Sequence, residues 1–161
     1  MQIATRQMLA SDVAEACALL NEIIRAGGTT AHEVAFSDAT FAQEFLSHAN
    51  LICCHVALDD RGVVAGFQTL WRDVDHSYAD IATFARLAPV LRGVGRALFQ
   101  DTATFARAAG LSEINATIRA DNVPGLGYYS KMGFVDFSTA CAIALTDGTP
   151  VDRISKRFNL S

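Results

Sequence analysis

The chain of 161 residues and 17.3 kDa lacks any apolar run close to the ~18–20 residues that a bilayer requires. Its start, Met1–Arg6, lacks the basic residues, apolar stretch and small-residue cleavage site of a secretory signal. It also lacks internal repeats, low-complexity tracts and linkers. We therefore expect one domain spanning residues 1–161 that is cytoplasmic and has no membrane partner.

The chain lacks any arrangement of cysteines suited to metal or disulfide chemistry. The four cysteines form no Cys-x-x-Cys pair, and no histidine stands at zinc-ligand spacing. Cys53 and Cys54 are adjacent in an expected strand, so their side chains should point to opposite faces of it. That geometry disfavours a bond between them. We expect no metal site, and buried thiols in a reducing compartment at Cys17, Cys53, Cys54 and Cys141.

An excess of positive charge is also absent. The formal net charge is −4 and the isoelectric point is about 5.4, which argues against nonspecific binding of nucleic acid. In contrast, 51% of the residues are hydrophobic, which is enough to bury a sizeable core. The composition indicates a globular protein with no nucleic-acid partner.

Hydrophobic periodicity predicts strands that pair locally, then a helical crossover, then a closing hairpin. This order is typical of an α/β (α+β) domain of three layers, with a mixed, mostly antiparallel sheet flanked by helices. Phe41 and Phe45 should point inward from a short helix. Strands are expected at 2–8, 51–58, 63–72, 80–87, 113–119, 135–145 and 151–158, and helices from Ser11–Asp12, Ser37, the segment after Gly95, and Asn122.

The segment between the strand at 80–87 and the next helix carries Arg92, Gly95 and Ala97. Small residues at a helix entrance leave backbone N–H groups free, and these groups together with the helix dipole favour an anion. The segment therefore predicts a binding site for a phosphorylated ligand. An ordinary helix start, with glycine for the turn and alanine for packing, would give the same pattern.

A second motif follows Ala97 by 25 residues, starting at Asn122. Together the two segments resemble the GNAT superfamily of N-acetyltransferases, which bind acetyl-CoA. The resemblance covers roughly residues 78–135 and implies a GNAT-like three-layer domain. In the second motif, Gly125 replaces the usual alanine, and the residues in register are Asn122, Tyr129, Lys131, Gly133 and Phe134.

The resemblance implies acetyl-CoA as co-substrate. The backbone of residues 92–97 would hold the pyrophosphate, and the strand residues 84–87 would pair with the pantetheine arm. The residues expected to contact acetyl-CoA are Phe84, Ala85, Arg86, Leu87, Arg92, Gly93, Val94, Gly95, Arg96, Ala97, Asn122, Gly125, Tyr129 and Lys131.

The resemblance also implies that Tyr129 is the general acid. A phenol with a pKa near 10 can donate a proton to a thiolate of similar basicity, although Tyr129 could instead serve only for packing. For the general base we select Asp80, with Glu33 and His76 as alternatives. A dedicated base is optional if the acceptor is an α-amino group, whose pKa is near 8.

The segment Gly28–Ala31 is similar to the Asn-Thr-Thr-Ala segment of acetyltransferases that act on amino acids and analogues such as phosphinothricin. We therefore expect an N-acetyltransferase for the primary amine of a small molecule. A protein N-terminal acetyltransferase and a non-catalytic acyl-CoA-binding module remain alternatives. Family habit and an apolar C-terminal hairpin predict a homodimer; the hairpin's apolar residues are Ile143, Leu145, Val151, Ile154 and Phe158.

Overall fold

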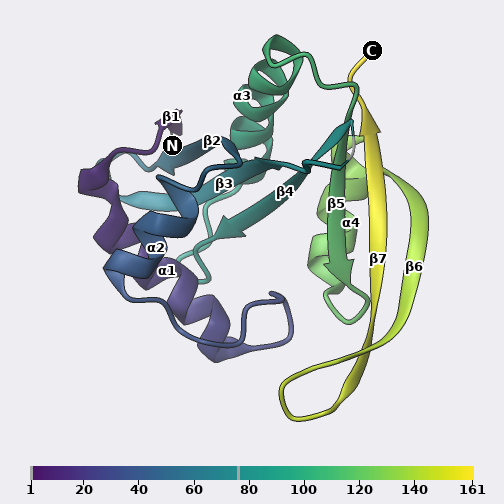
Figure 1. Cartoon of the computed structure of the whole chain (residues 1–161). Coiled ribbons are helices and arrows are strands. Elements are labelled where there is room, and N and C mark those ends of the chain that lie inside the picture. The colour runs from purple at the N-terminus through teal and green to yellow at the C-terminus, as the bar shows by residue number, and fades with distance from the viewer. Residues whose placement is uncertain (1, 76) are drawn as a thin grey trace.

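A seven-stranded sheet forms the middle layer of the structure, a computed structural model that describes residues 2–75 and 77–161 (Figure 1). The strand order is β1-β2-β3-β4-β5-β7-β6, and every neighbouring pair is antiparallel except β4 and β5. The predicted fold class is confirmed. The elements are β1 (Ala4–Gln7), α1 (Val13–Ala26), α2 (Asp38–Phe45), β2 (Leu51–Leu58), β3 (Val64–Arg72), β4 (Tyr78–Ala85), α3 (Val94–Ala108), β5 (Glu113–Arg119), α4 (Val123–Met132), β6 (Val135–Ala144) and β7 (Pro150–Asn159).

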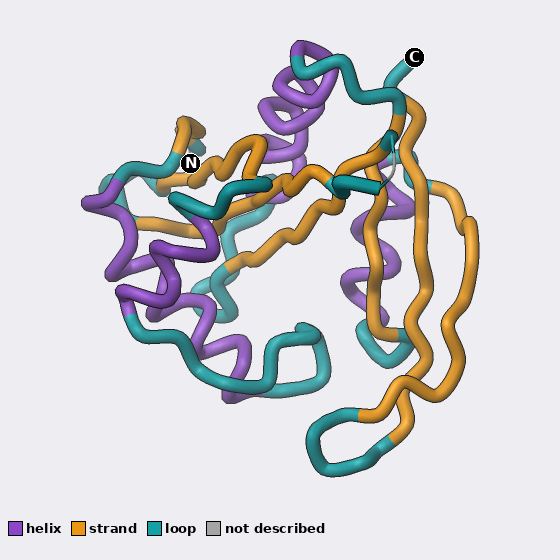
Figure 2. The backbone as a smooth tube through the Cα atoms, in the orientation of Figure 1, coloured by secondary structure: helices purple, strands orange, loops and turns teal. Residues whose placement is uncertain are grey.

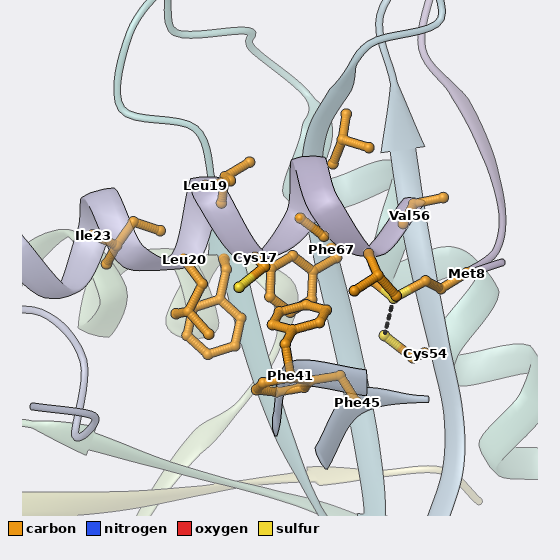
Figure 3. Packing of buried hydrophobic residues seen from close by; sticks show 14 residues of the cluster. Met8, Cys17, Leu19, Leu20, Ile23, Phe41, Phe45, Cys54, Val56 and Phe67 are labelled. Carbon is orange, nitrogen blue, oxygen red and sulfur yellow. Dashed lines mark hydrogen bonds between the residues drawn. The ribbon is translucent and has the colours of Figure 1, made fainter. Parts of the chain in front are cut away.

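Helices cover both faces of the sheet and bury its alternate side chains. Beneath α1, the rings of Phe41 and Phe45 each lie 5.4 Å from that of Phe67, as Figure 3 shows for this part of the core. Phe41 and Phe45 point inward, as predicted. Cys54 belongs to this cluster, whereas Cys53 packs on the opposite face with α3. The two adjacent thiols thus face different layers and remain free.

The start of α1 differs from the prediction. A short 3-10 turn precedes it, and the Asp12 side chain does not cap the helix. Instead its carboxylate accepts a hydrogen bond from Leu9 N–H at 2.7 Å and pairs with Arg6 at 2.6 Å. The Asp12 carboxylate therefore stabilises the turn between β1 and α1. The longest described helix, α3, has 15 residues, and no helix in the described ranges is long and apolar enough to cross a membrane.

The sheet opens between β4 and β5. These two strands pair only over 78–80 and 113–115, after which they diverge (Figures 1 and 2). β4 stays paired with β3 as far as Ala85, and β5 stays paired with β7 as far as Arg119. Each strand therefore follows its antiparallel partner away from the other. The β5-facing edge of Ile81–Ala85 has no strand partner.

The C-terminal hairpin forms the far edge of the sheet. All ten residues of β6 are exposed, including Cys141, which corrects the expectation that all four thiols are buried. Phe158 of β7 packs inward on Phe99 and Phe134, with ring centroids 5.0 and 5.3 Å away. It therefore serves the core rather than an outer apolar surface. The homodimer stays a prediction.

Candidate active site

A cavity of about 410 Å³ occupies the opening between β4 and β5. Its wall comes from the loop after α1, from β4, from the first turn of α3, from the end of β5 and from α4. Segments that lie far apart in the sequence therefore meet at one opening. The predicted ligand-contacting residues that line the cavity are Phe84, Ala85, Leu87, Gly95, Asn122, Gly125 and Tyr129.

The two described candidates for the general base do not line this cavity. The Asp80 carboxylate accepts a hydrogen bond from Asn115 Nδ2 at 2.8 Å, on the paired part of β4. The Glu33 carboxylate accepts hydrogen bonds from the N–H and the hydroxyl of Thr146 at 3.1 and 2.8 Å. His76 lies outside the described residues. The role of Asp80 stays a prediction that this geometry does not favour.

Of the predicted ligand contacts that do not line the cavity, Arg86 and Lys131 lie outside the phosphate segment 92–97. The Arg86 guanidinium donates to Asp59 at 3.1 Å, and its backbone N–H donates to Ala65 O at 2.9 Å. Because both groups are engaged elsewhere, the predicted contact of Arg86 with the ligand is not supported. Lys131 is exposed in the last turn of α4, on the far side from the helix start. The resemblance selected Arg86 by its place in a strand and Lys131 by its register in a motif, and neither gave the contacts of the side chain.

The first turn of α3 presents free backbone donors. Gly93 adopts a φ of +90°, and the first intrahelical bond runs from Ala97 N–H to Gly93 O at 3.0 Å. The N–H groups of residues 94–96 precede that bond, so they point out of the helix at its positive end. Val94 is buried, whereas the side chains of Arg92 and Arg96 are exposed at the entrance. This arrangement suits the anion site that the sequence predicts.

Gly95 is required because Tyr128 occupies the space beside it. A Cβ built at Gly95 would lie 2.9 Å from Tyr128 Cζ and would overlap the ring further. The Tyr128 hydroxyl donates to Gly95 O at 2.8 Å. The tyrosine thus joins α4 to the first turn of α3, a role that the sequence motif did not reveal.

Asn122 caps α4 and reaches across the opening. Its Oδ1 accepts a hydrogen bond from Gly125 N–H at 3.0 Å, and its Nδ2 donates to Thr29 O at 2.9 Å. A Cβ at Gly125 would lie 2.8 Å from Asn122 Cγ. A Cβ at this position would require the capping side chain of Asn122 to shift. One N–H of the Asn122 amide remains for a ligand.

The loop after α1 is tied to the opposite side of the cavity. Arg119 at the end of β5 donates to Thr30 O at 3.2 Å and pairs with Asp121 at 2.7 Å. Together with the bond from Asn122 to Thr29, this places residues 29–32 against α4 (Figure 2). The segment chosen from the sequence as the acceptor loop is therefore part of the cavity wall.

Tyr129 carries the hydroxyl that the sequence selects as the acid. Its side chain is buried, and its oxygen lies 2.8 Å from Thr83 Oγ1. Burial raises the pKa of Tyr129 well above its ordinary value, while the hydrogen bond with Thr83 opposes that rise. The phenol therefore stays protonated at neutral pH and lies in the wall of the cavity.

Sequence reasoning missed His32 as a site residue. It lines the cavity, with its ring 5.2 Å from that of Phe36 and 6.2 Å from those of Phe45 and Phe84. Burial lowers the pKa of His32, so the imidazole is neutral at neutral pH. Its place directly after Gly28–Ala31, the segment similar to part of the amino-acid acetyltransferases, was the available signal.

Comparisons with known proteins agree with this geometry. Residues 18–134 match the acetyltransferase (GNAT) family, and this range includes both sequence motifs. No match was found among curated proteins.

Solved structures share the fold over nearly the whole chain. An N-acetyltransferase from Staphylococcus aureus is 17% identical, with a TM-score of 0.88 and 100% of each chain covered. A phosphinothricin acetyltransferase from Sinorhizobium meliloti, solved in complex with acetyl-CoA, is 20% identical with a TM-score of 0.88, covering 100% of this chain and 90% of that one. A ribosomal-protein-alanine N-acetyltransferase from Brucella melitensis is 17% identical with a TM-score of 0.85, covering 97% and 99%.

These identities are low, so the structures establish the fold. The family match spans most of the chain and both motifs, and the cavity lies where those motifs meet. The chain therefore belongs to the GNAT family of acetyl-CoA-dependent N-acetyltransferases.

Proposed function

We propose that this protein transfers the acetyl group of acetyl-CoA to the primary amine of a small molecule, an amino acid or a close analogue. One observation carries the proposal: a protonated phenol, a free strand edge and a helix N-terminus all face one cavity. These are the parts that acetyl transfer from a thioester requires, namely a proton donor, a hold on the donor arm and a phosphate site.

The donor would lie along the free edge of β4. The N–H groups of residues 94–96 would hold the pyrophosphate, and the exposed guanidinium groups of Arg92 and Arg96 would add positive charge at the entrance. The pantetheine arm would extend the sheet beside Phe84, Ala85 and Leu87, which line the cavity. A main-chain N–H of this edge would then face the thioester oxygen and stabilise the charge that develops on it.

In the reaction, the neutral amine attacks the thioester carbon and a C–N bond forms. The C–S bond breaks, and its electron pair stays on the sulfur of coenzyme A. Tyr129 donates its phenolic proton to that thiolate, and the proton released by the amine restores the phenol through solvent or a base. No oxidant or reductant is needed, because the net change is an exchange of acetyl for hydrogen.

We assign the role of general base, which accepts the proton of the amine, to His32 rather than to Asp80. His32 is the described titratable side chain of the acceptor loop that lines the cavity and is neutral at pH 7, so its imidazole can accept a proton there. The rings of Phe36, Phe45 and Phe84 hold its orientation.

This assignment predicts a pH dependence. As the pH falls through the lowered pKa of His32, below the ordinary value near 6.5, the imidazole takes up a proton and kcat/KM should fall. Changing His32→Phe keeps the ring contacts but removes the base. We expect kcat/KM at pH 7 to fall by at most about 10²-fold, the lower end of the usual range, because solvent can also accept the proton of an α-amino group. The inflection due to His32 should disappear, while that of the acceptor amine, whose pKa is near 8, remains.

The matched control is His48→Phe, at an exposed histidine outside the cavity, which should keep the wild-type profile. If the second inflection, below the pKa of the acceptor amine, persists in His32→Phe and vanishes in Asp80→Asn, the base is Asp80 and the assignment to His32 is wrong.

The shape of the cavity supports a small acceptor. Asn122 and Arg119 hold the acceptor loop against α4, and Glu33 binds Thr146 at the tip of the β6–β7 hairpin. These bonds tie the acceptor loop to the end of β5, to the start of α4 and to the hairpin, which leaves it less free to move aside for a peptide than an untethered loop. The Gly28–Ala31 segment and the likeness to the Sinorhizobium phosphinothricin acetyltransferase point the same way. The likeness to a ribosomal-protein-alanine N-acetyltransferase keeps a protein N-terminus as the second candidate.

A panel of amines tests the proposed function directly. The protein is incubated with acetyl-CoA and free amino acids, phosphinothricin, methionine sulfoximine or N-terminal peptides beginning with alanine, and thiol release is recorded. We expect release with one or more of the amino-acid class and none above background with peptides. Release with peptides alone would establish the N-terminal acetyltransferase, and acetyl-CoA binding without release from any amine would indicate a non-catalytic acyl-CoA module.

A further inference from the structure

A chain of hydrogen bonds connects the first turn of α3 to Tyr129. The Tyr128 hydroxyl donates to Gly95 O at 2.8 Å, and Gln68 Nε2 lies 3.1 Å from the Tyr128 oxygen. The same Nε2 lies 2.8 Å from Thr83 Oγ1, which in turn lies 2.8 Å from the Tyr129 oxygen. Gln68 and Thr83 are direct partners across β3 and β4, so their side chains share one face of the sheet.

The number of protons on Tyr128 and Gln68 determines which group donates in the first two of these hydrogen bonds. A phenol has one proton, and Tyr128 gives it to Gly95 O. The Tyr128 oxygen can then only accept from Gln68, so the amide must present its NH₂ group rather than its oxygen. The second N–H of that group donates to Thr83 Oγ1.

The buried oxygen of the same amide supports this direction. Gln68 is fully buried, and its Oε1 has no hydrogen-bond partner among the described residues. Leaving a buried acceptor unpaired is unfavourable, and such a group calls for an explanation. The explanation here is that the NH₂ group must serve two hydroxyl oxygens at once, which only this orientation of the amide allows.

Thr83 accepts from Gln68, so its own proton remains available for Tyr129. With Thr83 donating to the Tyr129 oxygen, the phenolic proton is free to point into the cavity. We propose that Thr83, oriented by Gln68, is a positioning residue that aims the proton of Tyr129 at the leaving thiolate and then stabilises the phenolate. This inference rests on the proposed role of Tyr129 as the acid.

The environment of Tyr129 makes such a partner necessary. Burial disfavours the phenolate and raises the pKa of Tyr129, and the hydrogen bond with Thr83 is the contribution that lowers it. Hydrogen bonds to an ionised group are stronger than those between neutral groups. The bond with Thr83 therefore strengthens as the proton leaves, so it stabilises the transition state more than the resting enzyme.

Thr83→Val tests the proposal because it replaces the hydroxyl by a methyl group of similar size. We expect kcat to fall about tenfold, with the KM for acetyl-CoA changed by less than about twofold. Thr83→Ser restores a hydroxyl and should recover most of kcat. The matched control is Thr69→Val on β3 next to Gln68, where the buried hydroxyl has no hydrogen-bond partner among the described residues. It should leave kcat unchanged.

The double variant Thr83→Val/Tyr129→Phe separates a positioning role from a structural one. If Thr83 acts through Tyr129, then Thr83→Val has no further effect on kcat once the phenol is gone. A further tenfold loss in the double variant would show that Thr83 acts elsewhere and would overturn the proposal. So would wild-type kcat in Thr83→Val. If Tyr129→Phe alone has no effect, it is the proposed acid that fails.

Stability is measured alongside, since Thr83→Val leaves one N–H of Gln68 unpaired. Where that variant does not fold, Gln68→Leu removes the donor that orients Thr83 while keeping the hydroxyl. As a single substitution it should lower kcat by about threefold. Combined with Tyr129→Phe, it should cause no further loss. A Gln68→Leu protein with wild-type kcat would contradict the orienting role of Gln68.

Discussion

Replacing Tyr129 by phenylalanine should lower kcat by about 10²–10⁴-fold, the usual range for loss of general acid catalysis. The substitution removes one oxygen and keeps the ring, whose centroid lies 4.9 Å from that of Tyr128 and 5.1 Å from that of Phe134. Packing around the site should therefore persist. Because the hydroxyl is needed for the leaving group rather than for binding, the affinity for acetyl-CoA should change little.

The measurement is kcat with an acceptor from the amine panel, together with calorimetry of acetyl-CoA binding. Tyr78→Phe is the matched control, since Tyr78 does not line the cavity, and it should keep wild-type kcat. Product release can hide a slower chemical step, so acetyl transfer is also followed before the steady state. A variant that keeps more than a third of the wild-type rate in that step would rule out the acid role.

The sequence predicted elements well where local signals agree. β2 and β5 have the predicted bounds because an apolar run in β2 and alternating apolar residues in β5 both end at clear turn residues. α4 begins after Asn122, as its capping side chain predicts. The resemblance selected site residues on β4, α3 and α4, and seven of them line one cavity. The opening between β4 and β5 that makes room for this cavity was not predicted.

What the sequence could not give is the partner of each side chain. Arg86 stands in the right strand, but its guanidinium turns to Asp59, 27 residues earlier in the chain. The pairing of Gln68 with Thr83 depends on the register of two strands, and a shift by one residue would place them on opposite faces. These contacts are tertiary, and no local pattern encodes them.

Two glycines of α4 also have surroundings that the sequence does not reveal. Gly125 and Gly127 lie two residues apart in one helix, and the sequence does not separate their reasons. In the structure a Cβ at Gly125 would meet the Asn122 side chain, whereas one at Gly127 would have no neighbour within 4 Å. A side chain at the first position therefore requires Asn122 to shift, whereas one at the second meets nothing. This difference supplies a control for the phosphate site.

Changing Gly95→Glu should weaken acetyl-CoA binding by about a hundredfold, or roughly 2.8 kcal/mol. Two effects act together. The new Cβ overlaps the ring of Tyr128 and must displace it from the first turn of α3. The carboxylate then stands where the pyrophosphate would bind, and at an effective dielectric constant of about 20 a like charge at about 5 Å costs some 3 kcal/mol before screening by salt.

Two further variants separate these effects in the same calorimetric titration. Gly95→Ala adds only the Cβ and should lose part of the affinity at every salt concentration. The charged variant should recover affinity as salt rises, because screening weakens the repulsion. Gly127→Glu adds the same charge at an open position of α4 and should bind normally. If a folded Gly95→Glu protein binds acetyl-CoA with wild-type affinity, the pyrophosphate does not lie at residues 92–97, and the donor must enter the cavity by another route.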